Sequence, residues 1–90
     1  MNFEWDDDKQ LSNLAEHGLD FEQAALVFLG PTFEFGDTRH DYGEERTIAV
    51  GYAEGECIVV VFTRRDDAIR IISARRGGRR DKRKYHAHFA

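Results

Sequence analysis

The stretch Ile-Arg-Ile-Ile-Ser-Ala-Arg-Arg at residues 69–76 runs directly into Gly-Gly-Arg-Arg-Asp-Lys-Arg-Lys-Tyr at residues 77–85. The first segment is rich in isoleucine, which is typical of a β-strand, and the second is strongly basic. Since isoleucines and arginines share one segment, these cations belong to a folded sheet rather than to a loose tail. The sequence therefore predicts a sheet that presents positive charge towards one end of the chain.

The charge of the chain is divided between its two ends. From Arg64 onward there are ten Lys and Arg against three Asp, whereas residues 1–45 carry twelve Asp and Glu against Lys9 and Arg39. The formal net charge of −4 hides this division. A concentrated positive surface attracts polyanions, so the pattern indicates a nucleic-acid partner, with a merely solvated surface as the alternative.

Length and composition favour a small single domain that spans residues 1–90. No segment approaches the roughly 18 apolar residues that cross a bilayer, and the N-terminus is acidic where a signal peptide is basic. We therefore expect a cytoplasmic protein without a membrane partner. Cys57 opens an apolar run and is expected to be a buried side chain. His86 and His88 are two residues apart, on different faces of a helix, so neither a metal site nor a cofactor is expected.

The first third of the chain is predicted to form a short strand and a helix. Phe3 and Trp5 alternate with polar residues, as in a strand. Residues 7–17 have the spacing of a helix, and Gly18 is placed to end it. The expected apolar face of this helix consists of Leu11, Leu14 and Ala15.

A second helix is expected immediately afterwards, so that the two form a helical hairpin. Asp20 is a good N-cap, Gln23 completes a capping-box pattern, and Gly30-Pro31 ends the helix. Its apolar face consists of Phe21, Ala24, Ala25, Phe28 and Leu29.

The apolar period then changes from 3.6 to 2, which predicts an antiparallel meander. The expected strands are residues 32–35, 46–52, 57–65 and 69–75. A basic helix over residues 79–89 follows, with Gly77-Gly78 as the hinge that frees it from the strand. These elements predict an α+β fold of order β-α-α-β-β-β-β-α, in which a mainly antiparallel sheet packs against the helical hairpin.

The turn at Asp66-Asp67 predicts which side chains share a face of the sheet. A two-residue turn places Arg65 opposite Ala68, Thr63 opposite Arg70 and Val61 opposite Ile72. This face is expected to continue to Ala74 and Arg76. The opposite face is expected to hold Val60, Phe62, Arg64, Ile69, Ile71 and Arg75. Thr63, Arg65 and Arg70 are thereby gathered into one polar cluster.

Several motifs together resemble the BrnT family of toxins over nearly the whole chain. They are Phe3-Glu4-Trp5-Asp6 with Lys9, Asn13 and His17-Gly18, then Phe21-Glu22 with Ala24 and Phe28, Glu45-Arg46 with Gly51, Thr63 with Arg65, residues 69–75, and residues 79–85. The chain departs from the usual pattern at Glu16, at Arg64, and at Gly77-Gly78, where the family has Ala followed by Ser or Thr.

The resemblance implies a RelE/ParE-like fold and a ribonuclease that inhibits translation. It also implies neutralisation by a BrnA-like antitoxin of the ribbon-helix-helix class, with operator DNA bound only through that antitoxin.

RNA cleavage without a metal requires a base, cations that stabilise the phosphorane, and an acid for the leaving oxygen. Arginine suits the second role because its planar fork grips phosphate oxygens. The candidate catalytic residues are Arg65, Arg70, Arg75, His17 and Tyr85. The candidate RNA-binding residues are Lys9, Arg76, Arg79, Arg80 and Arg83. Each also has a plainer interpretation, such as a surface arginine or, for His17, a histidine that interacts with the helix dipole.

Three functions remain open at this point. The first is a metal-independent endoribonuclease with RNA as substrate. The second is a non-catalytic nucleic-acid-binding module that uses the same basic surface. The third is a basic surface that serves mainly to bind the antitoxin.

Overall fold

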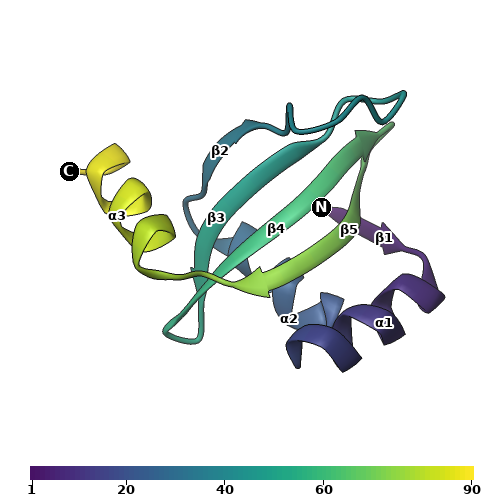
Figure 1. Cartoon of the computed structure of the whole chain (residues 1–90), viewed down its shortest axis with the longest axis horizontal. Helices are drawn as coiled ribbons and strands as arrows, with labels where there is room; N and C mark the ends of the chain where they lie inside the picture. Colours follow the sequence, from purple (N-terminus) through teal and green to yellow (C-terminus); the bar gives the residue numbers. More distant parts are fainter.

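A mixed five-stranded sheet forms the centre of the computed structural model, which describes residues 1–90 (Figure 1). Its strand order is β1-β5-β4-β3-β2. The strands are β1 (Asn2–Trp5), β2 (Phe33–Gly36), β3 (Thr47–Ala53), β4 (Glu56–Arg65) and β5 (Ala68–Arg76). Strands β2 to β5 pair antiparallel in sequence order, whereas β1 pairs parallel with β5. The α+β class is confirmed, with one parallel edge added to the expected meander.

Helix α1 (Asp7–His17) begins and ends where the sequence places it. The Asp6 carboxylate accepts hydrogen bonds from the backbone N–H groups of Asp8 and Lys9, at 2.8 and 3.2 Å. Gly18 ends the helix in the left-handed region, with φ of 66°, which glycine adopts without steric cost. The remaining helices are α2 (Phe21–Ala25), the 3-10 helix η1 (Leu26–Leu29) and α3 (Arg79–His88).

The single second helix expected over residues 21–29 is in fact two elements. The capping box between Asp20 and Gln23 is present and starts α2. After Ala25 the chain tightens into η1, as helix ends commonly do. Val27 of η1 packs so closely on Gly51 that a Cβ there would lie 3.1 Å from the Val27 Cβ.

The apolar face expected on α1 is wrong. Leu11 and Leu14 are 65% and 45% exposed, and the buried residue of α1 is Asn13. The Asn13 amide donates to the carbonyls of Leu19 and Ala74, at 2.9 and 2.8 Å, and accepts from the Ala74 N–H at 3.0 Å. Because β1 pairs with β5 only as far as Ile71, the side chain of Asn13 takes the place of a strand at Ala74.

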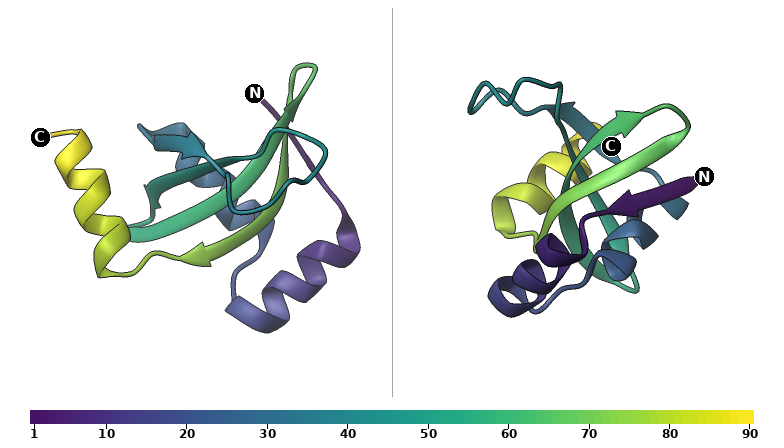
Figure 2. Two further views of the ribbon diagram at one scale, coloured as in Figure 1. Left: turned by 45° about the horizontal axis from the view of Figure 1, so that its top comes forward. Right: turned by 90° about the vertical axis from the view of Figure 1, so that its right-hand side faces the viewer.

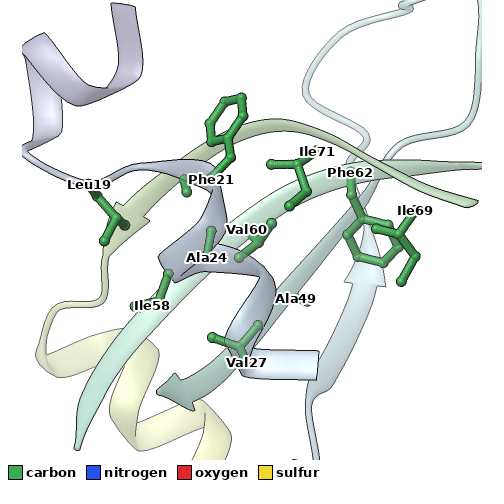
Figure 3. Close-up of a cluster of buried hydrophobic side chains, with 11 residues drawn as sticks. Leu19, Phe21, Ala24, Val27, Ala49, Ile58, Val60, Phe62, Ile69 and Ile71 are labelled. Carbon is green, nitrogen blue, oxygen red and sulfur yellow. The ribbon is translucent and has the colours of Figure 1, made fainter. Parts of the chain in front are cut away.

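The main core lies between the helices and one face of the sheet (Figure 3). It consists of Leu19 from the α1–α2 connection, Phe21, Ala24 and Val27 from α2 and η1, and Ala49, Ile58, Val60, Phe62, Ile69, Ile71 and Ala74 from the strands. All of these side chains are at most 6% exposed. At about 25 cal/mol per Å² of buried apolar surface, this cluster is the main source of stability.

A β-bulge in β5 changes the face assignment predicted for this strand. Phe62 pairs with Ile71, but Val61 pairs with Ser73, so Ile72 is the extra residue. From there on the alternation is inverted, because side chains alternate with a period of two. Ala74 and Arg76 therefore belong to the core face, and Arg75 belongs to the face of Thr63, Arg65 and Arg70, contrary to the expectation.

The other face of the sheet is covered at one end by α3 (Figure 2). A small cluster of Val50, Cys57 and Val59 lies there, and Tyr52 and Tyr85 pack against it. Cys57 is 4% exposed, which confirms its expected burial. Beyond α3 this face carries Thr63, which is buried, Arg70, which is half-buried, and Arg65, which is exposed.

Candidate functional site

Helix α3 is held to the end of β5 by one carboxylate. Asp81 accepts two hydrogen bonds from the Arg75 guanidinium, at 2.9 and 3.4 Å, and one from the Gly78 N–H at 2.9 Å. The Arg75 guanidinium is the main reason why the pKa of Asp81 lies below its ordinary range. The N-terminal end of α3 is therefore fixed relative to the sheet.

The two glycines before α3 do not free it from the strand, as was expected. The Gly77 N–H donates to the Cys57 carbonyl at 2.8 Å and so continues the pairing of β5 with β4. A Cβ at residue 77 would collide with the Cys57 sulfur. Gly77 is therefore required by the close approach of Cys57, and the hinge prediction is wrong at this residue.

One face of α3 carries a row of three cations and one histidine. Arg79, Lys82, Arg83 and His86 follow the spacing i, i+3, i+4, i+7, which places them side by side along a helix. All four are exposed, and none forms an ion pair within the chain. This row is the cationic surface that is free to meet an anion. Arg80 is also exposed on α3, outside the row.

A tyrosine and a histidine meet where α3 passes over β3. The Tyr52 hydroxyl oxygen lies 2.9 Å from His86 Nε2. The Tyr85 ring lies 5.1 Å from the Tyr52 ring and 5.4 Å from the His86 ring. Burial raises the pKa of Tyr52 further above neutral pH. The Tyr85 hydroxyl donates to the Pro31 carbonyl at 3.1 Å, which anchors the helix.

Sequence reasoning did not find the contact between Tyr52 and His86. The two residues are 34 positions apart and lie on different elements. The one signal available was the place of His86 in the row formed by Arg79, Lys82 and Arg83, which its helical spacing reveals.

The three candidate catalytic arginines share one face of the sheet, and each is paired with a carboxylate. Arg65 lies 3.5 Å from Glu44, Arg70 lies 3.5 Å from Glu4, and Arg75 is bound to Asp81 as described. Thr63, on the same face, donates to the Glu45 carbonyl at 2.8 Å. The face therefore presents guanidinium groups with partners rather than free charge.

The other candidates lie apart from this face. Arg76 lies on the core face, where its guanidinium donates to the His17 carbonyl at 2.9 Å and lies 3.4 Å from Glu56. It thus satisfies the end of α1, and its assignment as an RNA-binding residue stays a prediction. His17 and Lys9 are on α1, on the helical side of the sheet, with His17 Nε2 3.7 Å from Glu16. The structure does not bring His17 together with Arg65, Arg70 or Arg75.

A pocket of about 600 Å³ lies at the loop between β2 and β3 and has an acidic lining. It is lined by Gly36, Asp37, Thr38, His40, Asp41, Glu44, Glu45, Arg46 and Thr47. Asp37 is buried and bound by both Nε and Nη2 of Arg39 at 2.8 Å, and this pair holds the pKa of Asp37 far below its usual range. With Asp37 neutralised by Arg39, the lining still has three carboxylates, those of Asp41, Glu44 and Glu45, against the one guanidinium of Arg46, which makes a poor site for a phosphate.

No group of three or more His, Cys, Asp or Glu side chains is arranged to hold a metal ion. None of the helices combines the length and the apolar character that crossing a membrane requires.

The comparisons place the chain among the toxins of type II toxin-antitoxin systems. The family model described as "Ribonuclease toxin, BrnT, of type II toxin-antitoxin system" matches residues 5–81. The chain therefore belongs to the BrnT family of ribonuclease toxins, and such a family implies a protein antitoxin as partner. The matched range ends within α3, so Lys82 and His86 lie beyond it.

A solved structure supports the same family. The 1.1 Å crystal structure of the Brucella abortus ribonuclease toxin BrnT superposes on this chain with a TM-score of 0.65. The two sequences are 30% identical, and the match covers 88% of this chain and 99% of that chain. A comparison with curated proteins finds no match.

Proposed function

We propose that this chain is a metal-independent endoribonuclease of RelE/ParE-like fold that cleaves RNA in the cytoplasm and thereby inhibits translation. The observation that supports it most is the row of unpaired cations on α3 beside a sheet face that holds Arg70 and Arg75. In a family of ribonuclease toxins, such a surface is suited to the phosphate backbone of RNA.

The proposed chemistry is attack of a ribose 2′-hydroxyl on the adjacent phosphate. The pentacoordinate phosphorane carries extra negative charge, which guanidinium and ammonium groups stabilise where they are already positioned. Arginine and lysine can supply this charge without a metal, and α3 and β5 provide six such groups between Arg75 and Arg83. The products are a 2′,3′-cyclic phosphate and a 5′-hydroxyl.

The test is to incubate the purified protein with a defined RNA in excess EDTA and to identify the product ends. Cleavage that persists with 2′,3′-cyclic phosphate ends supports the proposal. Activity that disappears with EDTA and returns with Mg²⁺ would contradict metal independence.

A BrnA-like antitoxin of the ribbon-helix-helix class is the partner that we propose, with operator DNA bound only through it. The free cations of α3 favour an antitoxin surface that is acidic or aromatic and that covers this helix. The antitoxin should then prevent binding of a labelled, non-cleavable RNA. A ternary complex with undiminished RNA affinity would show that inhibition does not act by covering the cations.

The alternative is a non-catalytic module that binds nucleic acid through the same row of cations. It predicts salt-dependent RNA binding without any product. The EDTA experiment separates the two, because only the ribonuclease generates new RNA ends.

A further inference from the structure

We infer that His86 is the proton-transferring residue of the RNA-cleaving site and that Tyr52 positions its ring. The inference rests on the proposed ribonuclease function and adds to it the base that the sheet arginines do not provide. It is carried by the hydrogen bond between Tyr52 and His86, at 2.9 Å, and by the cations that share the face of α3 with His86.

The placement of His86 meets the geometric demands on such a residue. It is exposed, so RNA can reach it, while Tyr52 on β3 and the neighbouring Tyr85 hold its ring from the other side. Lys82 and Arg83 are one helical turn before it and Arg79 is two turns before it, on the same face of α3. A phosphate bound by these cations would lie beside the imidazole.

The hydrogen bond to Tyr52 also selects the reactive nitrogen. If Nε2 carries a proton and donates it to the Tyr52 oxygen, the bond is kept in both the neutral and the protonated imidazole. The remaining nitrogen, Nδ1, forms no hydrogen bond within the chain and is then free to accept a proton. Tyr52 thus holds the ring through the whole proton cycle without touching the substrate.

The step that follows is balanced. Nδ1 removes the proton of the 2′-hydroxyl, the 2′-oxygen forms a bond to phosphorus, and the bond between phosphorus and the 5′-oxygen breaks. The leaving 5′-oxygen takes a proton from water, and protonated His86 returns its proton to the hydroxide that remains. Arg79, Lys82 and Arg83 stabilise the phosphorane during the exchange.

The remaining histidines do not share this arrangement. His17 lies on the helical side of the sheet, and His40 lies in the acidic loop between β2 and β3. His88 is two residues from His86 and also exposed, but its ring packs on Phe33 at 4.6 Å, with no hydrogen bond. His88 is therefore a matched control on the same helix.

The experiment compares His86→Gln with His88→Gln in RNA cleavage and in binding of a non-cleavable RNA with 2′-deoxy substitution. We expect His86→Gln to lower kcat by about a hundredfold or more with RNA affinity within about twofold, and His88→Gln to keep both values. Unchanged melting temperatures check the fold. As a second variant, His86→Ala should regain cleavage when imidazole is added, since imidazole replaces the missing base.

Tyr52→Phe tests the positioning role through the nitrogen chemical shifts of His86. We expect the wild-type protein to show the tautomer with Nε2 protonated, and Tyr52→Phe to show a mixture of tautomers and a lower kcat with KM retained. A wild-type cleavage rate in His86→Gln, or equal losses of cleavage and RNA affinity, would overturn the inference. Absence of cleavage by the wild-type protein would instead overturn the proposed function, and this inference with it.

Discussion

The arginines of the sheet and the cations of α3 carry the same charge but stand in different surroundings. Arg65, Arg70 and Arg75 each have a carboxylate partner, whereas Arg79, Lys82 and Arg83 have none. The paired guanidinium groups are held in fixed orientations, and the free ones contribute a field that attracts polyanions. In the proposed ribonuclease this difference predicts a division of labour, in which α3 holds the reacting phosphate beside His86 and the sheet arginines orient the rest of the RNA.

The pairs of the sheet arginines are not equally strong. Arg65 and Glu44 are 53% and 31% exposed, so their ion pair contributes less than about 1 kcal/mol and yields readily to a phosphate. Arg75 makes two hydrogen bonds to Asp81, which also binds the start of α3. The first pair can therefore exchange its carboxylate for RNA, while the second holds the architecture together.

The largest effect is expected for Arg70→Lys, which keeps the charge but removes the planar fork. If Arg70 orients the RNA for reaction at His86, turnover falls by about a hundredfold, because even a small misplacement of the reacting groups costs about that much. Single-turnover cleavage with urea unfolding measures activity and stability separately. Arg75→Lys should show the same loss, together with a looser α3, because lysine cannot make both bonds to Asp81.

The control is Arg64→Lys, on the same strand pair but on the opposite face, where the guanidinium lies 4.9 Å from the Phe62 ring. Its turnover should stay within about twofold of wild type. Wild-type cleavage by a folded Arg70→Lys protein would show that the paired arginine has no part in the chemistry, and the division of labour would fail.

The next effect concerns the free cations. Replacing Arg79, Lys82 and Arg83 together by Gln should weaken binding of single-stranded RNA roughly fiftyfold near physiological salt. The slope of log affinity against log salt should fall by about 2, because each phosphate contact contributes about 0.7. Fluorescence titrations at several salt concentrations measure both quantities.

The control for this variant is Arg64→Gln, which removes a cation on the opposite face of the sheet, where Arg64 pairs with Glu34. It should leave the salt slope unchanged. Equal losses of affinity in both variants would mean that RNA binding depends only on the net charge of the protein and not on the position of the cations on α3.

A smaller effect, of about 1–2 kcal/mol in the free energy of unfolding, is expected for Asp81→Asn. The folded-state pKa of Asp81 is lowered, so its bond to Arg75 stabilises the protein above the ordinary value of 3.8 and is lost as the pH falls through the folded value. The difference between wild type and Asp81→Asn should therefore be full at pH 7 and shrink below pH 3.8. A difference that stays constant over this range would show that the pair does not hold α3.

Local signals in the sequence predicted much of the fold. The bounds of α1, the capping box at Asp20 and the pairing of Thr63 with Arg70 all followed from rules that act over a few residues. The bulge at Ile72 did not, because a run of apolar residues fits either register. The bulge places Arg75 on the same face as Arg65 and Arg70, whereas the sequence had placed it on the opposite face. The three candidate arginines therefore share one face of the sheet.

The parts that escaped prediction depend on contacts between distant segments. Asn13 belonged to the motifs of the family. Why a polar residue is buried there becomes clear only from its hydrogen bonds to Ala74, which is 61 positions away in the sequence. Nothing in the helical pattern of α1 indicates that Leu11 and Leu14 stay exposed. The sequence likewise does not indicate that Tyr52 is the partner of His86, because Tyr52 has the pattern of an ordinary strand residue and contacts His86 only through the packing of α3 on the sheet.

The smallest effect is expected at Gly78, the N-cap of α3. Its backbone is extended, with φ of −93°, and a Cβ there would meet only the Asp81 carboxylate, at 3.9 Å. Serine fits this position and adds a side-chain acceptor for the Asp81 N–H, so Gly78→Ser should stabilise the protein by a few tenths of a kcal/mol. Differential scanning calorimetry is the measurement.

The neighbouring glycine should behave in the opposite way, which makes it the control. Gly77→Ala brings a methyl group against the Cys57 sulfur and should cost about 1–3 kcal/mol, and Cys57→Ala in the same chain should recover much of it. If Gly78→Ser instead stabilised the protein by more than about 1 kcal/mol, the start of α3 would be frayed in the wild type. The bonds from Asp81 to Arg75 and Gly78 would then be too weak to fix the free cations beside the sheet, and the two basic regions would not act as one site.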